Sequence, residues 1–155
     1  MPTPQPGRRS LLTAAVALPV SAAAAPLLTA PAAAAESAGG FNVVYDWRPL
    51  TLRPGVKAFP DDVPQARVVR IAGTDFLQMR GGAGCSFTGD APLGSLPAGL
   101  AVPKLTRGVC PRNNVNGVTA CRVEADIHGQ VIVLGATPTS KITWVQLDSF
   151  SSVLA

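Results

Sequence analysis

The alternation of side-chain types after Val118 constrains the fold of this chain more than any other feature. From residue 121 to 128, small or apolar side chains take every second position and polar ones the positions between: Cys121, Val123, Ala125 and Ile127 against Arg122, Glu124, Asp126 and His128. A period of two places the two sets on opposite faces of a β-strand. Residues 130–135 then run apolar on both faces, as in a central strand, and residues 141–147 form a third strand that carries Trp144.

Strand and turn signals of the same kind recur through most of the chain. Further strands are predicted at residues 41–46 (extended as far as 52), 65–72, 75–80 and 104–110, and the second and third of these should form a hairpin. Pro- and Gly-rich turns separate them, and Asn116-Gly117 is a strong hairpin turn. The prediction is an all-β fold: one antiparallel β-sandwich or jelly-roll-like domain, with residues 36–46 as lead-in and first strand and residues 47–155 as the sandwich.

The first 35 residues have the pattern of an export signal. Arg8-Arg9 is followed by Ser10 and two leucines, then by an Ala-rich apolar stretch and a run of alanines ending at Ala35. A basic region, an apolar region and a small-residue cleavage site define a signal peptide, and the paired arginines are typical of the twin-arginine route. The general secretory route stays open, because Arg-Arg also serves as an ordinary basic region. Interrupting prolines argue against a membrane anchor. We expect cleavage after Ala35 and a secreted, extracellular protein.

The charge of the mature part excludes some partners. The formal net charge of +4 falls to near +2 once Arg8 and Arg9 are removed with the leader. This balance is too weak to favour nucleic acid or an anionic membrane surface as a partner. We therefore expect no nucleic-acid binding, and no membrane association after cleavage.

The three cysteines favour one disulfide bond, because an exported domain meets oxidising conditions. A hairpin turn centred near Val115-Asn116 would place Cys110 opposite Cys121, and directly opposed Cβ atoms lie at roughly 4–5.5 Å, close to disulfide geometry. We predict this bond and leave Cys85 free; Cys85–Cys110 and Cys85–Cys121 are the alternatives. The spacing is poor for a metal, so no metal site is predicted.

Catalytic signals are weak throughout the chain. His128 is the one histidine, and it falls at a predicted strand end beside a glycine. Glu124 and Asp126 share one face of a strand and could form an acid–base pair, but they are more simply the outward half of an amphipathic strand. We predict no catalytic residue, no cofactor and no enzymatic activity, and we keep a hydrolase using these two carboxylates as a third hypothesis.

The aromatic side chains are better candidates for function. Tyr45, Trp47, Phe59 and Trp144 could build a surface for sugars, because flat rings pair with the apolar faces of pyranosides while Trp and Tyr add a polar edge. The alternative is that Trp47 and Trp144 close the two ends of the sandwich. Tyr45, Trp47 and Trp144 are therefore predicted as ligand-binding residues.

Several short motifs resemble one family. The chain is similar in five places to the small β-sandwich head domains at the C-termini of phage tail fibres and related actinobacterial secreted proteins. These places are Trp47 to Leu52 with Gly55-Val56, the hairpin segments Gln65–Val69 and Leu77–Gly81, the turn Leu96–Pro103 and the segment Ile142–Asp148. The resemblance implies a receptor- or saccharide-binding module without catalysis, often a homotrimer. This chain departs from the pattern in its leader, its lack of a fibre shaft and its cysteines.

These observations predict a secreted, non-catalytic module that binds a saccharide or another cell-surface ligand. The alternative is a secreted protein-binding module or protease inhibitor, in which the loop between Cys110 and Cys121 presents Arg112 at a constrained hairpin tip. In that case Arg112 would be the ligand-binding residue.

Overall fold

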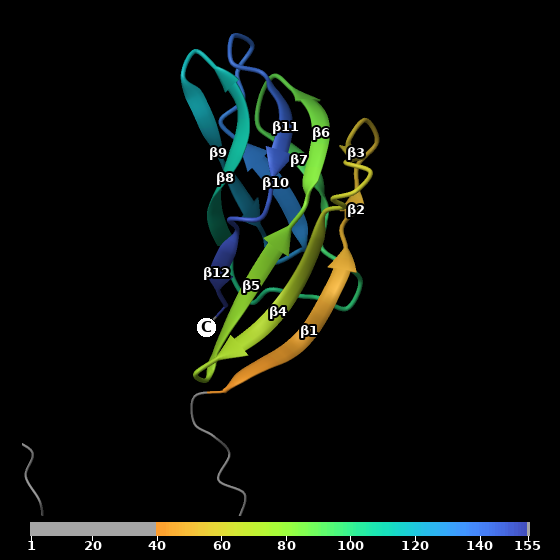
Figure 1. Ribbon diagram of the computed structural model, residues 1–155, viewed down its shortest axis with the longest axis vertical. Coiled ribbons are helices and arrows are strands. Elements are labelled where there is room, and N and C mark those ends of the chain that lie inside the picture. Colours follow the sequence, from red (N-terminus) through yellow and green to blue (C-terminus); the bar gives the residue numbers. More distant parts are fainter. Residues whose placement is uncertain (1–39, 155) are drawn as a thin grey trace, which may run out of the picture. The chain divides into compact units, whose positions relative to one another are not determined.

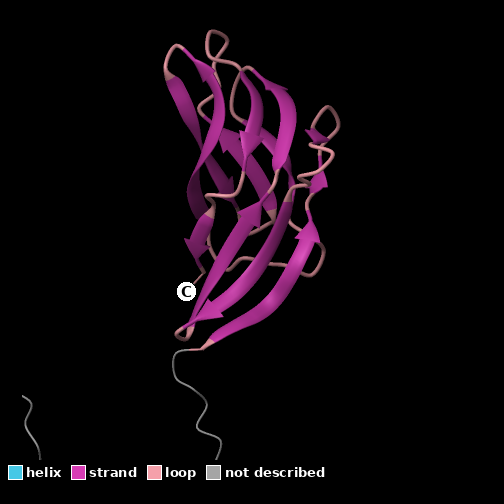
Figure 2. Ribbon diagram, in the orientation of Figure 1, coloured by secondary structure: helices cyan, strands magenta, loops and turns pink. Residues whose placement is uncertain are grey.

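The structure is a computed structural model that describes residues 40–154, so the predicted leader and its cleavage site lie outside the described residues. The described part contains twelve strands and no helix (Figures 1 and 2). The strands are β1 (Phe41–Pro49), β2 (Thr51–Leu52), β3 (Lys57–Ala58), β4 (Gln65–Ile71), β5 (Thr74–Arg80), β6 (Gly82–Phe87), β7 (Ala91–Ser95), β8 (Thr106–Val115), β9 (Val118–Ala125), β10 (Gln130–Leu134), β11 (Ile142–Gln146) and β12 (Ser151–Val153). Every strand pair is antiparallel, which confirms the predicted fold class.

The smaller sheet has four strands in the order β1-β4-β5-β12. Its centre is the predicted hairpin, in which β4 and β5 pair without interruption from Gln65↔Arg80 to Ile71↔Thr74. The turn consists of Ala72 and Gly73, both with positive φ (49° and 82°), one residue earlier than the sequence suggested. Such a two-residue turn matches the twist of the flanking strands and so fixes their register.

The larger sheet has eight strands in the order β2-β7-β10-β9-β8-β11-β6-β3. Its two edge strands, β2 and β3, are separated by residues 53–56 alone. A linker of this length reaches about 20 Å at most, so the two edges of the sheet must lie near each other. The eight-stranded sheet is therefore curled until it is almost closed.

One continuous stretch of chain passes from the smaller sheet into the larger one at Gly81. The residue lies between β5 and β6 and has φ 90°, which side chains rarely tolerate. A Cβ atom here would also lie 2.3 Å from the carbonyl oxygen of Val63. The Gly81 N–H donates to Asp148 Oδ1 at 2.8 Å, and the Gly81 carbonyl accepts from the Leu147 N–H at the same distance. This corner fixes the position of one sheet on the other.

The core is continuous between the two sheets. One cluster of buried side chains combines residues of the smaller sheet with residues of the larger one: Ala66, Val68, Leu77 and Met79 with Leu93, Val123, Val131, Val133, Ile142 and Val145. Phe150, 1% exposed, packs against Gly108 of β8, where a Cβ atom would lie 2.6 Å from the ring. This packing of two sheets makes the unit the predicted β-sandwich.

The hairpin of β8 and β9 is longer than the sequence suggested. Its turn is Asn116-Gly117, with φ of 53° and 83°, and β8 continues through Pro111 as far as Val115. The register shifts between Pro111 and Val115, and this shift restores the pairing Cys110↔Cys121. The predicted opposition of the two cysteines is thus confirmed, although the turn lies one residue later than expected.

The predicted disulfide is wrong for this structure, in which Cys85, Cys110 and Cys121 are all free thiols. The Cys121 thiol points at the backbone of its neighbour and donates to the Cys110 carbonyl oxygen, with sulfur and oxygen 3.5 Å apart. Register alone therefore does not bring the two sulfur atoms into bonding geometry. Burial raises the pKa of all three thiols, to about 11 for Cys85 and Cys121 and to about 12 for Cys110.

Candidate ligand-binding site

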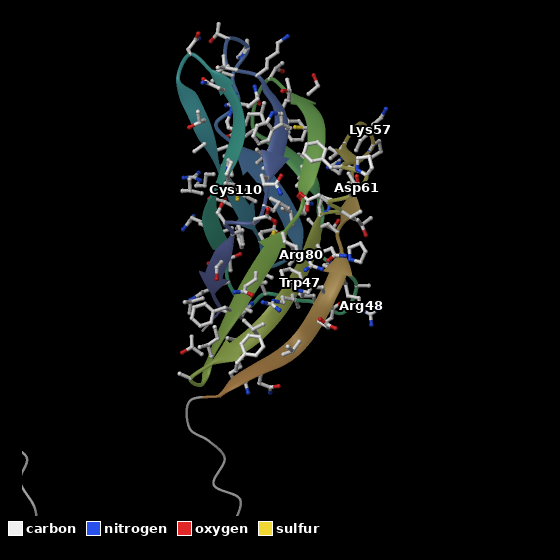
Figure 3. The ribbon with its side chains drawn as sticks, in the orientation of Figure 1. Trp47, Arg48, Lys57, Asp61, Arg80 and Cys110 are labelled. Atoms are coloured by element: carbon white, nitrogen blue, oxygen red, sulfur yellow. The ribbon has the colours of Figure 1, made fainter. Side chains whose placement is uncertain are left out.

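Trp47 lies at the centre of a cluster of polar side chains on the outward face of the four-stranded sheet. The guanidinium carbon of Arg67 is 4.5 Å from the centre of the Trp47 ring, and that of Arg80 is 4.3 Å away. Arg67 alternates along β4 with Ala66 and Val68, which are buried, so its side chain leaves the sheet on the outward side. Figure 3 shows Trp47 and Arg80 next to each other on this face.

Two glutamines hold the arginines in place. Arg67 Nε donates to Gln78 Oε1 at 2.8 Å. Arg80 donates to Gln65 Oε1 through Nε at 2.9 Å and through Nη2 at 2.6 Å. The strand register explains both pairs, because Arg67 is opposite Gln78 and Gln65 is opposite Arg80. We call Trp47, Gln65, Arg67, Gln78 and Arg80 the Trp47 cluster.

No described carboxylate neutralises the positive charges of the Trp47 cluster. Within residues 40–154, the ion pairs join Arg70 to Asp75 and join Arg107 and Arg122 to Glu124, and none of them includes Arg67 or Arg80. Since each guanidinium carries five N–H groups and a glutamine oxygen occupies only one or two of them, both arginines keep donors that no described residue accepts.

A hollow of about 400 Å³ adjoins this cluster at the end of β4 and β5. Gln65 and Arg80 line one side of it, and the loop residues Pro60, Asp61, Asp62 and Val63 line the other. The Asp62 carboxylate accepts from Gln146 Nε2 at 2.6 Å, whereas the Asp61 carboxylate has no hydrogen-bond donor among the described residues. Figure 3 places the labelled Asp61 on the same side of the molecule as Arg80.

Tyr45 belongs to the other face of the same sheet. It pairs with Val68, which is buried, and its hydroxyl donates to the Ala98 carbonyl oxygen at 3.0 Å. The ring lines a cavity of about 390 Å³ between the sheet and residues 99–103. Tyr45 therefore fastens a loop to the inner side of the sheet, and Tyr45 and Trp47 do not form one surface.

Trp144 lies on β11, in the larger sheet. It is half-buried and lines a shallow hollow of about 660 Å³ together with Val109, Pro111 and Thr119. Val109, in the same hollow, is 67% exposed. The three aromatic residues predicted to bind a ligand thus occupy three separate places, and neither tryptophan is fully buried.

Arg112 does not lie at a hairpin tip, and the prediction that it is presented there is wrong. Only 2% of the residue is exposed. Its guanidinium donates to the carbonyl oxygens of Lys141 at 2.7 Å, Asn113 and Ser140 at 3.2 Å each, and Gly135 at 3.4 Å. The physical reason is the later turn: β8 runs on past Arg112, whose side chain enters the interior and holds the segment from 135 to 141. The inhibitor hypothesis loses its contact residue.

The two carboxylates of the hydrolase hypothesis have structural partners. Glu124 Oε1 accepts from Arg107 Nε at 2.9 Å, and it also forms an ion pair with Arg122, whose Nε lies 3.1 Å away. Asp126 Oδ1 accepts from the backbone N–H groups of His128 and Gln130, which closes the turn before β10 and ends β9 at Ala125. Both carboxylates are therefore engaged in holding the fold.

Sequence reasoning singled out Trp47 as a candidate but missed the two arginines that lie against its ring. Gln65 and Arg67 on one strand, with Gln78 and Arg80 on the next, form a repeated Gln–Arg pattern at a spacing of two. Once the hairpin register is known, this pattern puts each arginine opposite a glutamine of the other strand. The signal was available in the sequence, but it depended on the exact position of the turn.

The fold defines a class: an antiparallel β-sandwich in which one sheet is open and the other is curled almost into a barrel. The described residues include no helix with the length and apolar character needed to cross a membrane.

No protein-family model matches this chain, and no curated protein matches it. Among solved structures, the fold is similar to that of the receptor binding protein (gp15) of Listeria phage PSA, with a TM-score of 0.50 and 15% sequence identity. The similarity covers 76% of this chain and 67% of the phage protein. At this identity the likeness concerns the fold.

Proposed function

We propose that this protein is a non-catalytic binding module for a ligand on a cell surface, and that the Trp47 cluster makes the contact. The observation that carries the proposal is the pair of outward guanidiniums, Arg67 and Arg80, stacked on Trp47 with donors that no described residue uses. Donors held ready in this way favour binding, because little side-chain entropy is lost when a ligand accepts them.

The fold similarity adds support from a different direction. The phage protein with a similar fold is a receptor binding protein, and the motif resemblance in the sequence implies the same class of function. The motif resemblance also implies a homotrimer, which remains a proposal and is tested by the mass of the purified protein in solution.

Binding to intact cells and to envelope fractions tests the proposal. The labelled protein is incubated with envelopes of several bacteria, actinobacteria included, and the bound fraction is measured against protein concentration. We expect saturable binding and no release of envelope fragments detectable by mass spectrometry. Absence of binding to every envelope by correctly folded protein would contradict a binding function, and release of fragments would contradict the absence of catalysis.

We also propose that the protein is exported, with the first 35 residues as a cleaved leader. The support is the sequence pattern around Arg8 and Arg9 and the alanine run before Glu36. Fusion of residues 1–35 to a reporter enzyme should place the reporter outside the cell, with a new N-terminus at residue 36. Replacing both arginines by lysine should stop export if the twin-arginine route is used, and leave it unchanged if the general secretory route is used.

A further inference from the structure

The Trp47 cluster and the neighbouring hollow together indicate a chemical class of ligand. We propose that the hollow between Arg80 and Asp61 binds an acidic sugar unit, one that carries a carboxylate or a phosphate, within a cell-surface polysaccharide. This inference rests on the proposed function and assigns it a ligand class and a position.

The first step is the charge. Arg67 and Arg80 lie 4.5 Å and 4.3 Å from one ring centre, so their guanidinium carbons cannot be more than about 9 Å apart. Two like charges at this separation repel each other, and the ring face and the two glutamine oxygens offset that repulsion. An anionic ligand gains from both charges, because neither has a carboxylate partner among residues 40–154. Planar guanidinium groups match carboxylate and phosphate oxygens in geometry.

The second step is the opposite wall of the hollow. Asp61 offers a carboxylate that no described residue uses, and it faces the same space as Arg80. A ligand that carried only negative charge would be repelled by Asp61 and also by Asp62, which lines the same hollow and whose hydrogen bond to Gln146 leaves its charge in place. A sugar acid avoids this conflict, since its acidic group can turn toward Arg80 while its hydroxyl groups donate to Asp61. The hollow thus fits a ligand with both hydroxyl donors and an acidic group.

The third step concerns the size and polarity of the hollow. Its volume of about 400 Å³ lies at the lower end of the range for small-ligand sites. Three of its six lining residues carry charge, and aromatic side chains are absent from the lining. The buried centre of a protein–protein contact is instead depleted of charged residues and enriched in aromatic ones. The lining is therefore unlike the centre of a protein–protein contact, and its charged and amide groups suit a ligand rich in hydroxyl groups.

Trp47 acts in this scheme as a positioning residue. It fixes the direction of Arg80, which lines the hollow, and that of Arg67, which lies against the same ring but outside the lining. Loss of the ring should therefore weaken binding without removing a donor, and the effect should be greater for a ligand that needs both arginines than for one that needs a single arginine.

Titration calorimetry with defined polymers tests the inference on the full chain. The probes are polygalacturonate for the carboxylate form, poly(glycerol phosphate) for the phosphate form and dextran as a neutral polymer. We expect binding to at least one acidic polymer, none to dextran, and weaker binding as sodium chloride is raised. Arg80→Gln should weaken binding about tenfold, since Arg80 lines the hollow and a charge-assisted contact is lost. Arg67→Gln should weaken it by a smaller factor, because Arg67 lies outside the lining and adds only its charge. Trp47→Leu should weaken it as well.

Arg70→Gln is the matched control. Arg70 lies on the same strand as Arg67, but it is paired with Asp75 at 2.6 Å, so its replacement should leave affinity unchanged. An equal loss in Arg70→Gln and Arg80→Gln would mean general charge attraction and would overturn the inference. Circular dichroism on each variant establishes that the fold is kept.

Failure of the inference and failure of the proposed function give different results. Binding to envelopes that is unchanged in Arg67→Gln and Arg80→Gln leaves the binding function standing and overturns the acidic-sugar site. Binding that disappears after protease treatment of the envelopes identifies a protein as the ligand and overturns it too. Binding that survives protease and is competed by the acidic polymer supports it, and absence of binding to any envelope refutes the proposed function itself.

Discussion

Replacement of Arg112 by methionine tests whether a buried guanidinium holds the segment from 135 to 141 on the larger sheet. Methionine has a similar length but no hydrogen-bond donors. The contact to the Lys141 carbonyl oxygen, at 2.7 Å, is the shortest of the four and is a charge-assisted bond. Hydrogen bonds to charged groups contribute about 1.5–3 kcal/mol each to stability.

The four contacts do not simply add. The Lys141 carbonyl oxygen also accepts from Asn113 Nδ2 at 2.9 Å, and the Ser140 carbonyl oxygen also accepts from the Thr137 N–H at 3.1 Å. These two acceptors therefore keep a partner when Arg112 is replaced. The contact to Gly135, at 3.4 Å, is long and weak. We expect Arg112→Met to lower the free energy of unfolding by about 3 kcal/mol, mainly from the lost Lys141 bond, with a smaller part from the contacts to Asn113 and Gly135.

Urea denaturation measures this effect. With a slope of roughly 1–2 kcal/mol per molar urea, a loss of this size lowers the midpoint by about 2 M. Arg122→Met is the control: Arg122 is exposed, and its partner Glu124 keeps Arg107, so the loss should stay below about 1 kcal/mol. The structural role assigned to Arg112 is incorrect if the free energies of unfolding of the two variants differ by less than about 1 kcal/mol.

Two further predictions concern close packing and the thiols. Gly94→Ala should destabilise the fold by about 1–3 kcal/mol, because the added Cβ would lie 2.3 Å from the Thr51 carbonyl oxygen and separate β2 from β7. Gly89→Ala is the control: its added Cβ would have no atom within 4 Å, so the temperature of thermal unfolding should not change. The thiols of Cys85, Cys110 and Cys121 should react slowly with iodoacetamide at neutral pH unless the protein is unfolded. The reason is that burial raises the pKa of each thiol from 9.0 to about 11 or 12. The unfolded chain then loses these protons first, so stability should fall as pH rises through the range from 9 to 12; rapid labelling of folded protein would contradict this explanation.

Local patterns in the sequence predicted the strands that carry their own signal. The alternation after Val118 gave β9, the apolar run gave β10, and Trp144 fell on a strand as expected. The hairpin of β4 and β5 was found because its turn chemistry and its two strands are adjacent in the chain. In these cases the information that fixes the structure lies within a few residues.

Strands that depend on distant partners were not predicted. The segment of β6, from Gly82 to Phe87, contains two glycines and has low β-propensity. It forms a strand because β3 and β11 pair on its two sides. Gly82 is needed there for packing, since a Cβ would lie 2.4 Å from the ring of Phe59. Tertiary contacts of this kind leave no periodic pattern in the sequence.

In the candidate site, too, features set by the local sequence could be predicted, and features set by distant strands could not. Trp47 was predicted from its residue type, but the role of its neighbours depended on a cross-strand register. Arg112 was misplaced because the whole loop between Cys110 and Cys121 was treated as a hairpin tip, while β8 continues to Val115 and the chain turns at Asn116-Gly117. Burial of a charged side chain against carbonyl oxygens is a property of the assembled sheet, and no single segment specifies it.

The near-closure of the larger sheet has a consequence for self-association. An unpaired strand edge is a template on which another chain can add a strand. A curled sheet whose two edge strands lie near each other offers little accessible unpaired edge. The long free edge among the described residues then belongs to β1, nine residues at the border of the smaller sheet. Two irregularities in its pairing, between Val43 and Tyr45 and between Tyr45 and Arg48, together with Pro49 at its end, interrupt that edge. Such interruptions protect a β-protein from fibril growth at high local concentration.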